Sequence, residues 1–185
     1  MCIRDRSRNN KTDIFFKVLK CFEDGNIEFL VETPWGKFQA ASKIESEFNL
    51  YNLFLTLPYY QFINGDCEDF FAEVENLSLP MGRLNKIKKG NIYIDYAHTP
   101  KALETVCKCL FKKKKNKLII VFGAGGERDK GKRALMGEVA DKYCEKIYIT
   151  SDNPRNEDPQ QIANMIAEGI EELDKICICL LYTSD

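Results

Sequence analysis

The chain has 185 residues, of which 44% are hydrophobic and 30% charged, and this composition excludes a disordered or low-complexity protein. Lys and Arg (27) nearly balance Asp and Glu (28), which argues against a nucleic-acid-binding protein dominated by basic charge. No apolar run approaches the roughly 18 residues of a membrane-spanning helix, so we expect no membrane span.

Cysteine and histidine usage argues against a zinc site. The eight cysteines form no Cys-x-x-Cys pair, and His98 is the only histidine. We therefore expect reduced thiols in a cytoplasmic protein, with Cys107 and Cys109 packed on a helix face.

The two ends of the chain are predicted to be sequencing adapter rather than protein. One permitted codon choice for residues 179–185 has a reverse complement that encodes residues 1–5, so one short duplex read from both strands accounts for both ends. This duplex resembles the mosaic-end adapter of transposon-based sequencing libraries. We assign residues 1–6 and 179–185 to adapter and expect residues 7–178 to be an internal fragment.

The first 79 residues are predicted to contain strands followed by helices. Apolar runs bounded by turn signals predict three strands, at residues 14–19, 27–31 and 37–41. Helical spacing of apolar residues predicts a helix over 48–62, which Pro58 should kink or end, and a weaker helix over 66–77. Residues 78–82 have the composition of a linker, so we place a domain boundary between residues 79 and 80.

After the linker, strands and helices alternate. Strands are predicted at residues 92–95, 118–122 and 147–150, and helices at 100–111, 132–143 and 158–173, the last with Asp158 as N-cap. We expect Leu135 and Leu173 among the inward-facing side chains of the second and third helices. The alternation predicts an α/β domain with a mostly parallel sheet and right-handed crossovers.

Ligands bind beyond the carboxyl ends of the strands in such sheets. Three polar clusters follow predicted strands, at residues 95–100, 123–133 and 151–155. We therefore expect all three clusters to line one crevice.

The glycine-rich loop over residues 123–133 fits neither standard nucleotide-binding fingerprint. Arg133 occupies the Ser/Thr position of a P-loop, and Arg128 stands where the dinucleotide fingerprint has its third glycine. What remains is a group of four cations at a helix N-terminus, Arg128, Lys130, Lys132 and Arg133, which suits anionic oxygens. A solvated turn is the alternative.

Arg155 and Asp152 together suit an amino acid ligand. The guanidinium of Arg155 is a planar fork that binds a carboxylate through two hydrogen bonds, and Asp152 supplies a charge for an ammonium group. A local salt bridge that caps the turn is the alternative. His98 is the one candidate for acid–base catalysis, although no Gly-x-Ser-x-Gly elbow accompanies it and a structural role is favoured.

Taken together, the motifs resemble the Mur ligases of peptidoglycan synthesis, in family order and over nearly all of residues 7–178. The matching stretches are residues 48–52 (Phe-Asn-Leu-Tyr-Asn), 82–83 (Gly-Arg), 95–100 (Asp-Tyr-Ala-His-Thr-Pro), 122–133 and 152–155 (Asp-Asn-Pro-Arg). The resemblance implies that residues 7–79 are the C-terminal part of a central ATP-binding domain. It implies that residues 80–178 are a truncated, Rossmann-like C-terminal domain.

The resemblance also implies which residues bind ligands. Asn49 and Asn52 match positions near the adenine of ATP, and Arg83 and Asp95 match residues that meet ATP. The meso-diaminopimelate site is matched by five residues, Arg128, Asp152, Asn153, Pro154 and Arg155. The implied reaction joins meso-diaminopimelate to UDP-N-acetylmuramoyl-L-alanyl-D-glutamate through an acyl phosphate, with ATP and Mg²⁺. We expect a monomeric bacterial cytoplasmic enzyme with no nucleic-acid partner, whose metal ligands lie mostly outside this fragment.

The sequence departs from the family pattern at two positions and lacks three family elements. Asn85 stands where the family often has Glu, and Pro58 interrupts a helix that usually lacks proline. The resemblance implies that the P-loop and the modified, Mg²⁺-binding lysine lie upstream of the matched region, and that a later Gly/Glu element that completes the amino acid pocket lies downstream. We therefore expect the 185-residue chain alone to be inactive. Two alternatives stay open: a non-catalytic α/β binding module, and a related ligase of the lysine-adding or folylpolyglutamate type.

Overall fold

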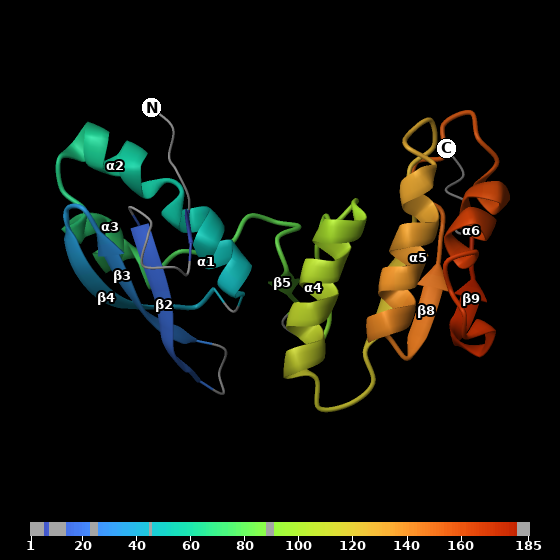
Figure 1. Ribbon diagram of the computed structural model, residues 1–185, viewed down its shortest axis with the longest axis horizontal. Coiled ribbons are helices and arrows are strands. Elements are labelled where there is room, and N and C mark those ends of the chain that lie inside the picture. Colours follow the sequence, from blue (N-terminus) through green and yellow to red (C-terminus); the bar gives the residue numbers. More distant parts are fainter. Residues whose placement is uncertain (1–5, 8–13, 23–25, 45, 88–90, 181–185) are drawn as a thin grey trace. The chain divides into compact units, whose positions relative to one another are not determined.

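The computed structural model describes residues 6–7, 14–22, 26–44, 46–87 and 91–180. The chain forms two compact units, Met1–Asp95 and Tyr96–Asp185, each with its own hydrophobic core (Figure 1). The predicted adapter residues 1–5 and 181–185 lie outside the described residues, and the predicted boundary between residues 79 and 80 stays a prediction.

An antiparallel sheet forms the centre of the first unit. Its strands are β1 (Arg6–Ser7), β2 (Ile14–Cys21), β3 (Ile27–Thr33) and β4 (Gly36–Ser42), in that order. β1 runs parallel to β2, and the other neighbours are antiparallel. Alternating residues of β3 (Ile27, Phe29, Val31) are buried, as expected for a strand with one face on a core. All three predicted strands are confirmed.

Three helices complete this core, α1 (Glu47–Phe54), α2 (Leu57–Asn64) and α3 (Glu68–Val74). The predicted helix over residues 48–62 is two helices, because the first ends before Pro58. Pro58 lies in the first turn of α2, where its missing N–H breaks no helical hydrogen bond. The rings of Phe16, Phe29 and Phe54 pack with centroids 5.1 to 5.7 Å apart.

Residues 92–95 do not form the predicted buried strand of a parallel sheet. β6 (Tyr93–Ile94) instead pairs antiparallel with β5 (Asn85–Lys86), and Ile92 and Ile94 are exposed. Antiparallel strands need only a short connection, whereas parallel neighbours need a long crossover. A short apolar run does not distinguish the two pairings, so the sequence prediction was wrong here.

The second unit has the predicted α/β architecture. Its parallel sheet has the order β7 (Ile119–Phe122), β8 (Lys146–Ile149) and β9 (Ile176–Ile178). Its helices are α4 (Pro100–Lys113), α5 (Gly131–Tyr143), α6 (Pro159–Ala167) and the 3₁₀ turn η1 (Leu173–Lys175). The core includes Cys107, which confirms its packing role. β9 was not predicted from the sequence, and it ends at Ile178, the last residue before the segment assigned to adapter.

The last helix begins as predicted and ends early. Asp158 caps α6 by accepting a hydrogen bond from the Gln160 backbone N–H at 3.0 Å. The helix ends at Ala167 rather than near residue 173, and Leu173 is 71% exposed. The prediction that Leu173 faces inward is therefore wrong, because it assumed that the helix continues to residue 173.

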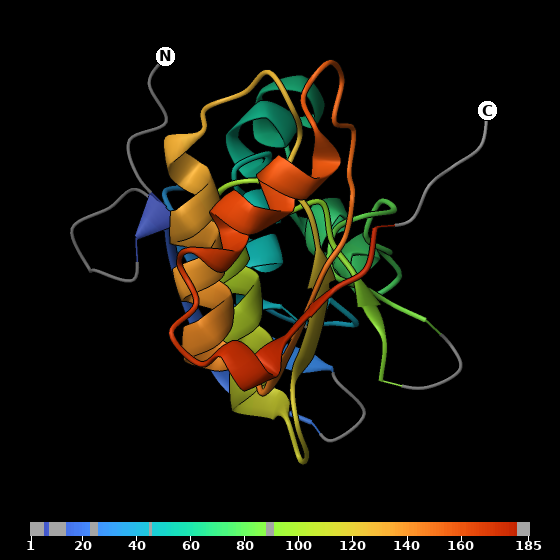
Figure 2. The same cartoon turned by 90° about the vertical axis from the view of Figure 1, so that its right-hand side faces the viewer.

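Two glycines let α5 and α6 pack backbone to backbone (Figures 1 and 2). A Cβ atom on Gly137 would lie 2.1 Å from the carbonyl oxygen of Ile166, and one on Gly169 would lie 1.9 Å from that of Ala134. This contact fixes which face of α5 is buried. The predicted burial of Leu135 is therefore wrong, since Leu135 is 47% exposed while Met136 and Gly137 are buried.

We predict that Gly137→Ala destabilises the second unit, although alanine is the better helix former. The added methyl group forces the two helices apart, at a cost of about 1–3 kcal/mol in the free energy of unfolding. Urea denaturation followed by circular dichroism measures this cost. Glu138→Ala, at the exposed neighbouring position, is the control, and equal midpoints for the two variants would contradict the prediction.

Candidate functional site

The loops that follow β7 and β8 meet at one end of the second unit (Figures 1 and 2). The backbone N–H of Gly126 donates to the carbonyl of Asn153 at 2.8 Å. A Cβ atom on Gly126 would lie 1.8 Å from the carbonyl oxygen of Pro154, so only glycine fits this contact. The predicted meeting of these two polar clusters is confirmed. The third predicted cluster, residues 95–100, follows a strand that is not part of this sheet.

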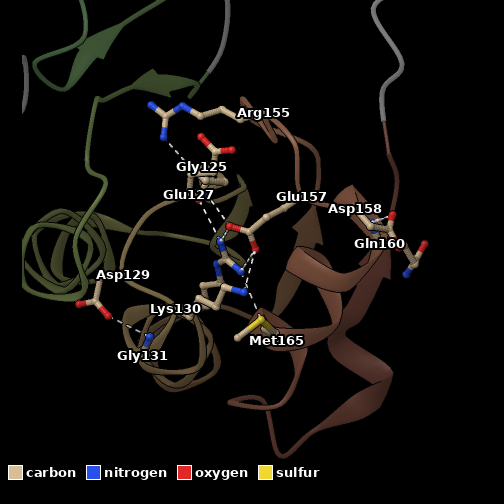
Figure 3. A network of polar contacts seen from close by, with 12 residues as sticks. Gly125, Glu127, Asp129, Lys130, Gly131, Arg155, Glu157, Asp158, Gln160 and Met165 are labelled. Carbon is tan, nitrogen blue, oxygen red and sulfur yellow. Dashed lines mark hydrogen bonds and ion pairs between the residues drawn. The ribbon is translucent and has the colours of Figure 1, made fainter.

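A buried ion pair lies beneath the two loops. The guanidinium of Arg133 on α5 donates from Nη1 to Glu157 Oε2 at 2.9 Å and from Nη2 to Glu157 Oε1 at 3.0 Å. It also donates to the Gly125 carbonyl at 3.2 Å and lies 3.2 Å from the sulfur of Met165. Arg133 is 0% exposed. Figure 3 shows the Glu157 carboxylate pointing inward, toward Lys130 and Met165.

This burial corrects the predicted cluster of four cations. Arg133 faces inward, and its charge is matched by Glu157 rather than held for a ligand. Lys130 lies 3.6 Å from the same carboxylate, and Lys132 Nζ donates to the His98 carbonyl at 3.1 Å. Sequence periodicity missed the buried arginine because a charged residue is expected on the solvent face of a helix. Arg128 is exposed and stays a candidate for ligand binding.

The surroundings of Glu157 hold its carboxyl group in the ionised form. Hydrogen bonds from Arg133 and from the backbone N–H of Glu127 lower the pKa of Glu157 to about 2, and the nearby charge of Lys130 acts in the same direction. Glu157 is therefore an anion throughout the physiological range. Through these hydrogen bonds Glu157, in the loop that follows β8, is joined to α5 and to the loop that follows β7.

Arg128 and Asp152 both lie close to Gly125. A Cβ atom placed on Gly125 would be 3.9 Å from Cγ of Arg128 and 4.0 Å from Oδ2 of Asp152. Both side chains belong to exposed residues. Two residues of opposite charge, one from each loop, therefore lie close to one small residue at the predicted crevice.

Arg155 lies back over the glycine-rich loop. Its Nη1 donates to the carbonyl of Gly126, and its backbone N–H donates to Asn153 Oδ1 at 3.3 Å. Arg155 has φ 51° and Glu127 has φ 52°, so each is a non-glycine residue in the left-handed region. Among the residues that the structure describes, no ion pair joins Asp152 to Arg155. This arrangement does not support the alternative in which the two residues only cap a turn.

The predicted ATP-contacting residues lie in the first unit. Asn49 is buried, and its Nδ2 donates to Ser46 Oγ at 2.6 Å and to the Arg83 carbonyl at 3.2 Å. The pairing of Asn85 with Ile94 places Arg83 and Asp95 at the same end of the β5–β6 pair. Asn52 is exposed. The roles of these residues toward ATP stay predictions.

Asn85, the departure from the family pattern, shapes the turn that presents Arg83. Its Oδ1 accepts from the Arg83 backbone N–H at 3.0 Å, and its Nδ2 donates to the Leu79 carbonyl at 3.2 Å. His98 is exposed, and its Nδ1 lies 3.0 Å from the Tyr96 carbonyl oxygen. This contact is local and tests neither the structural role favoured for His98 nor a role in catalysis.

The described part of the chain contains no group of three or more His, Cys, Asp or Glu residues that could hold a metal ion. Within the same residues, no helix is both long and apolar enough to cross a bilayer.

We predict that Glu157 stabilises the folded chain less as the pH falls into the acidic range. Its pKa in the folded chain, about 2, lies below the ordinary value of 4.5, so the contribution is complete above about pH 4.5 and is lost as pH falls toward 2. The difference in free energy of unfolding between the wild-type chain and Glu157→Gln should be flat from about pH 8 to 5 and then shrink. Urea unfolding across this range measures it, with Glu138→Gln as control. A difference that persists unchanged at about pH 2.5 would be evidence against the ion pair.

The comparisons with known proteins agree with the fold and the motifs. The family model "Mur ligase, glutamate ligase domain" matches residues 82–179, more than half of the chain. A protein of Prochlorococcus marinus subsp. pastoris named UDP-N-acetylmuramoyl-L-alanyl-D-glutamate--2,6-diaminopimelate ligase is 39% identical over 176 residues, which cover 90% of this chain and 34% of that protein. A protein of the same name from Chlamydia trachomatis serovar D is 45% identical over 137 residues, covering 71% of this chain and 28% of that protein.

Solved structures show the same fold. A structure with that ligase name covers 93% of this chain and 36% of its own, at 33% identity and a TM-score of 0.56. Folylpolyglutamate synthase of Mycobacterium tuberculosis, complexed with ADP, covers 89% of this chain and 38% of its own, at 18% identity and a TM-score of 0.71. The chain thus spans about a third of the length of the relatives it matches. It belongs to the Mur ligase family.

Proposed function

We propose that this chain is the part of an ATP-dependent amide ligase that recognises meso-diaminopimelate and adds it to UDP-N-acetylmuramoyl-L-alanyl-D-glutamate in bacterial peptidoglycan synthesis. The names of the relatives at 39% and 45% identity support the reaction. The observation that carries the assignment is the convergence of Arg128, Asp152 and Arg155 on residues 125–126 at the ends of adjacent parallel strands.

The three charged side chains match an amino acid that has a second carboxylate. Arg155 presents a fork suited to the distal carboxylate, and Asp152 suits an ammonium group. Lysine lacks this carboxylate, so it would leave the arginine fork without its partner. Leaving such a group unpaired in a bound complex is costly, which gives the site its discrimination.

In the proposed reaction the γ-phosphoryl group of ATP is transferred to the side-chain carboxylate of D-glutamate, which gives an acyl phosphate and ADP. The diaminopimelate amine then attacks the acyl carbon, and inorganic phosphate leaves. Residues of this chain orient the amine substrate and, through Arg83 and Asp95, approach ATP. Their contribution is positioning and charge complementarity. We propose that the phosphate-binding loop and the Mg²⁺ ligands belong to the rest of the enzyme, which we expect to be cytoplasmic and monomeric.

The fold alone does not choose between amino acid substrates. The folylpolyglutamate synthase structure shares it at 18% identity, so likeness to that structure concerns the architecture only. The choice of diaminopimelate rests on residues 152–155 and on Arg128.

We predict that residues 7–178, exchanged for the aligned segment of the Prochlorococcus relative, give a ligase that prefers meso-diaminopimelate over L-lysine by about 100-fold or more. ADP release measured with each amino acid tests this preference. Unmodified relative and the isolated 185-residue chain are the controls, and we expect no ligation by the isolated chain. Preference for glutamate would favour the folylpolyglutamate type, and a folded chimera inactive with every amino acid would favour a binding module.

We also predict that Gly125→Ala in this chimera impairs use of the amino acid without disturbing the fold. The new Cβ would contact its neighbours at 3.7 to 4.0 Å, which is ordinary van der Waals distance, but it would lie against both Arg128 and Asp152. The KM for diaminopimelate should rise about tenfold, the effect of losing about 1.4 kcal/mol of binding, while the KM for ATP is unchanged. An equal rise in both values would contradict the proposed site.

A further inference from the structure

We infer that Arg133 and Glu157 are positioning residues for the amino acid site, holding Arg128 and Arg155 in place without touching the ligand. This inference rests on the proposed function, because it names what fixes the geometry of that same site.

Hydrogen bonds connect the ion pair to the loop backbone beside both proposed ligand-binding arginines, Arg128 and Arg155. Glu157 accepts a hydrogen bond from the backbone N–H of Glu127, the residue before Arg128. Arg133 donates to the carbonyl of Gly125, the residue before Gly126, and the Gly126 carbonyl accepts from Arg155. The backbone on both sides of Gly126 is therefore tied to one buried pair.

The backbone at these points needs to be held. Glu127 and Arg155 adopt left-handed conformations at φ 52° and 51°, which L residues other than glycine disfavour. Asn156 Nδ2 donates to Glu127 Oε1 at 2.6 Å, so the two strained segments also bind each other. The surrounding contacts maintain this conformation, and the Arg133–Glu157 pair is the buried member of those contacts.

The low exposure of Arg133 and Glu157 distinguishes these positioning residues from the exposed residues that we propose bind the ligand. Arg133 is 0% exposed and the Glu157 side chain is 19% exposed, whereas Arg128, Asp152 and Arg155 are exposed. Figure 3 shows Glu157 below the loop residues, with Arg155 lying on the other side of Gly125. Lysine at position 133 would keep the charge but would lose the fork that bonds Glu157 through two nitrogens and Gly125 as well.

The test is a ligand titration of the chimera with the Prochlorococcus relative, followed by isothermal titration calorimetry, because the chimera supplies the downstream element that completes the amino acid pocket. The chimera without further substitution, Glu157→Gln and Arg133→Lys are each titrated with meso-diaminopimelate and with L-lysine, well below their thermal midpoints. We expect Glu157→Gln to weaken diaminopimelate binding about tenfold and lysine binding much less, so that the preference for diaminopimelate falls. Glu172→Gln, which breaks an exposed pair with Lys175 in the same unit, should leave the preference unchanged.

Each outcome decides between the two proposals. If both variants melt earlier but keep the wild-type preference, the pair is only structural and the inference is overturned. If the chimera without further substitution shows no preference for diaminopimelate, the proposed function fails and this inference fails with it. If Glu157→Gln does not fold, the ligand preference of Arg133→Lys decides the test instead, because this variant keeps the buried positive charge.

Discussion

The buried ion pair between Arg133 and Glu157 is the contact on which the end of the second unit depends. Arg133 is fully buried, and a buried charge without a partner costs several kcal/mol, so Arg133 requires the carboxylate of Glu157. The pair joins a helix that follows β7 to a loop that follows β8. The two loops, the exposed arginines and the close backbone contact at Gly126 all occupy positions set by this pair.

The architecture of the second unit was largely predictable. Alternating apolar segments predicted three of its helices and two of its strands, and Asp158 before a proline correctly placed the start of α6. Because carboxyl ends of parallel strands meet at one edge, the meeting of residues 123–133 and 151–155 also followed from the sequence. The caps and periodicities are local signals, and the structure confirms them where no distant contact competes.

The wrong predictions share one cause: contacts between residues far apart in the sequence decided which side chains are buried and which strands pair. Arg133 is buried because Glu157, 24 residues away, matches its charge, and no pattern around Arg133 indicates this. Leu135 is exposed because Gly137 lies against Ile166 and sets the rotation of α5. Residues 93–94 pair with 85–86 rather than joining the parallel sheet, since an apolar run alone does not specify its neighbour.

We propose that specificity within this fold resides in the loops rather than in the sheet. Related architectures at 15–18% identity bear the names of ligases for different substrates. The most direct measurement is a crystal structure of the chimera with meso-diaminopimelate. The account predicts that one carboxylate of the ligand bonds to Arg155, with an ammonium group at Asp152 and the Arg133–Glu157 pair intact beneath it. A ligand bound elsewhere, or one that contacts Glu157 directly, would contradict it.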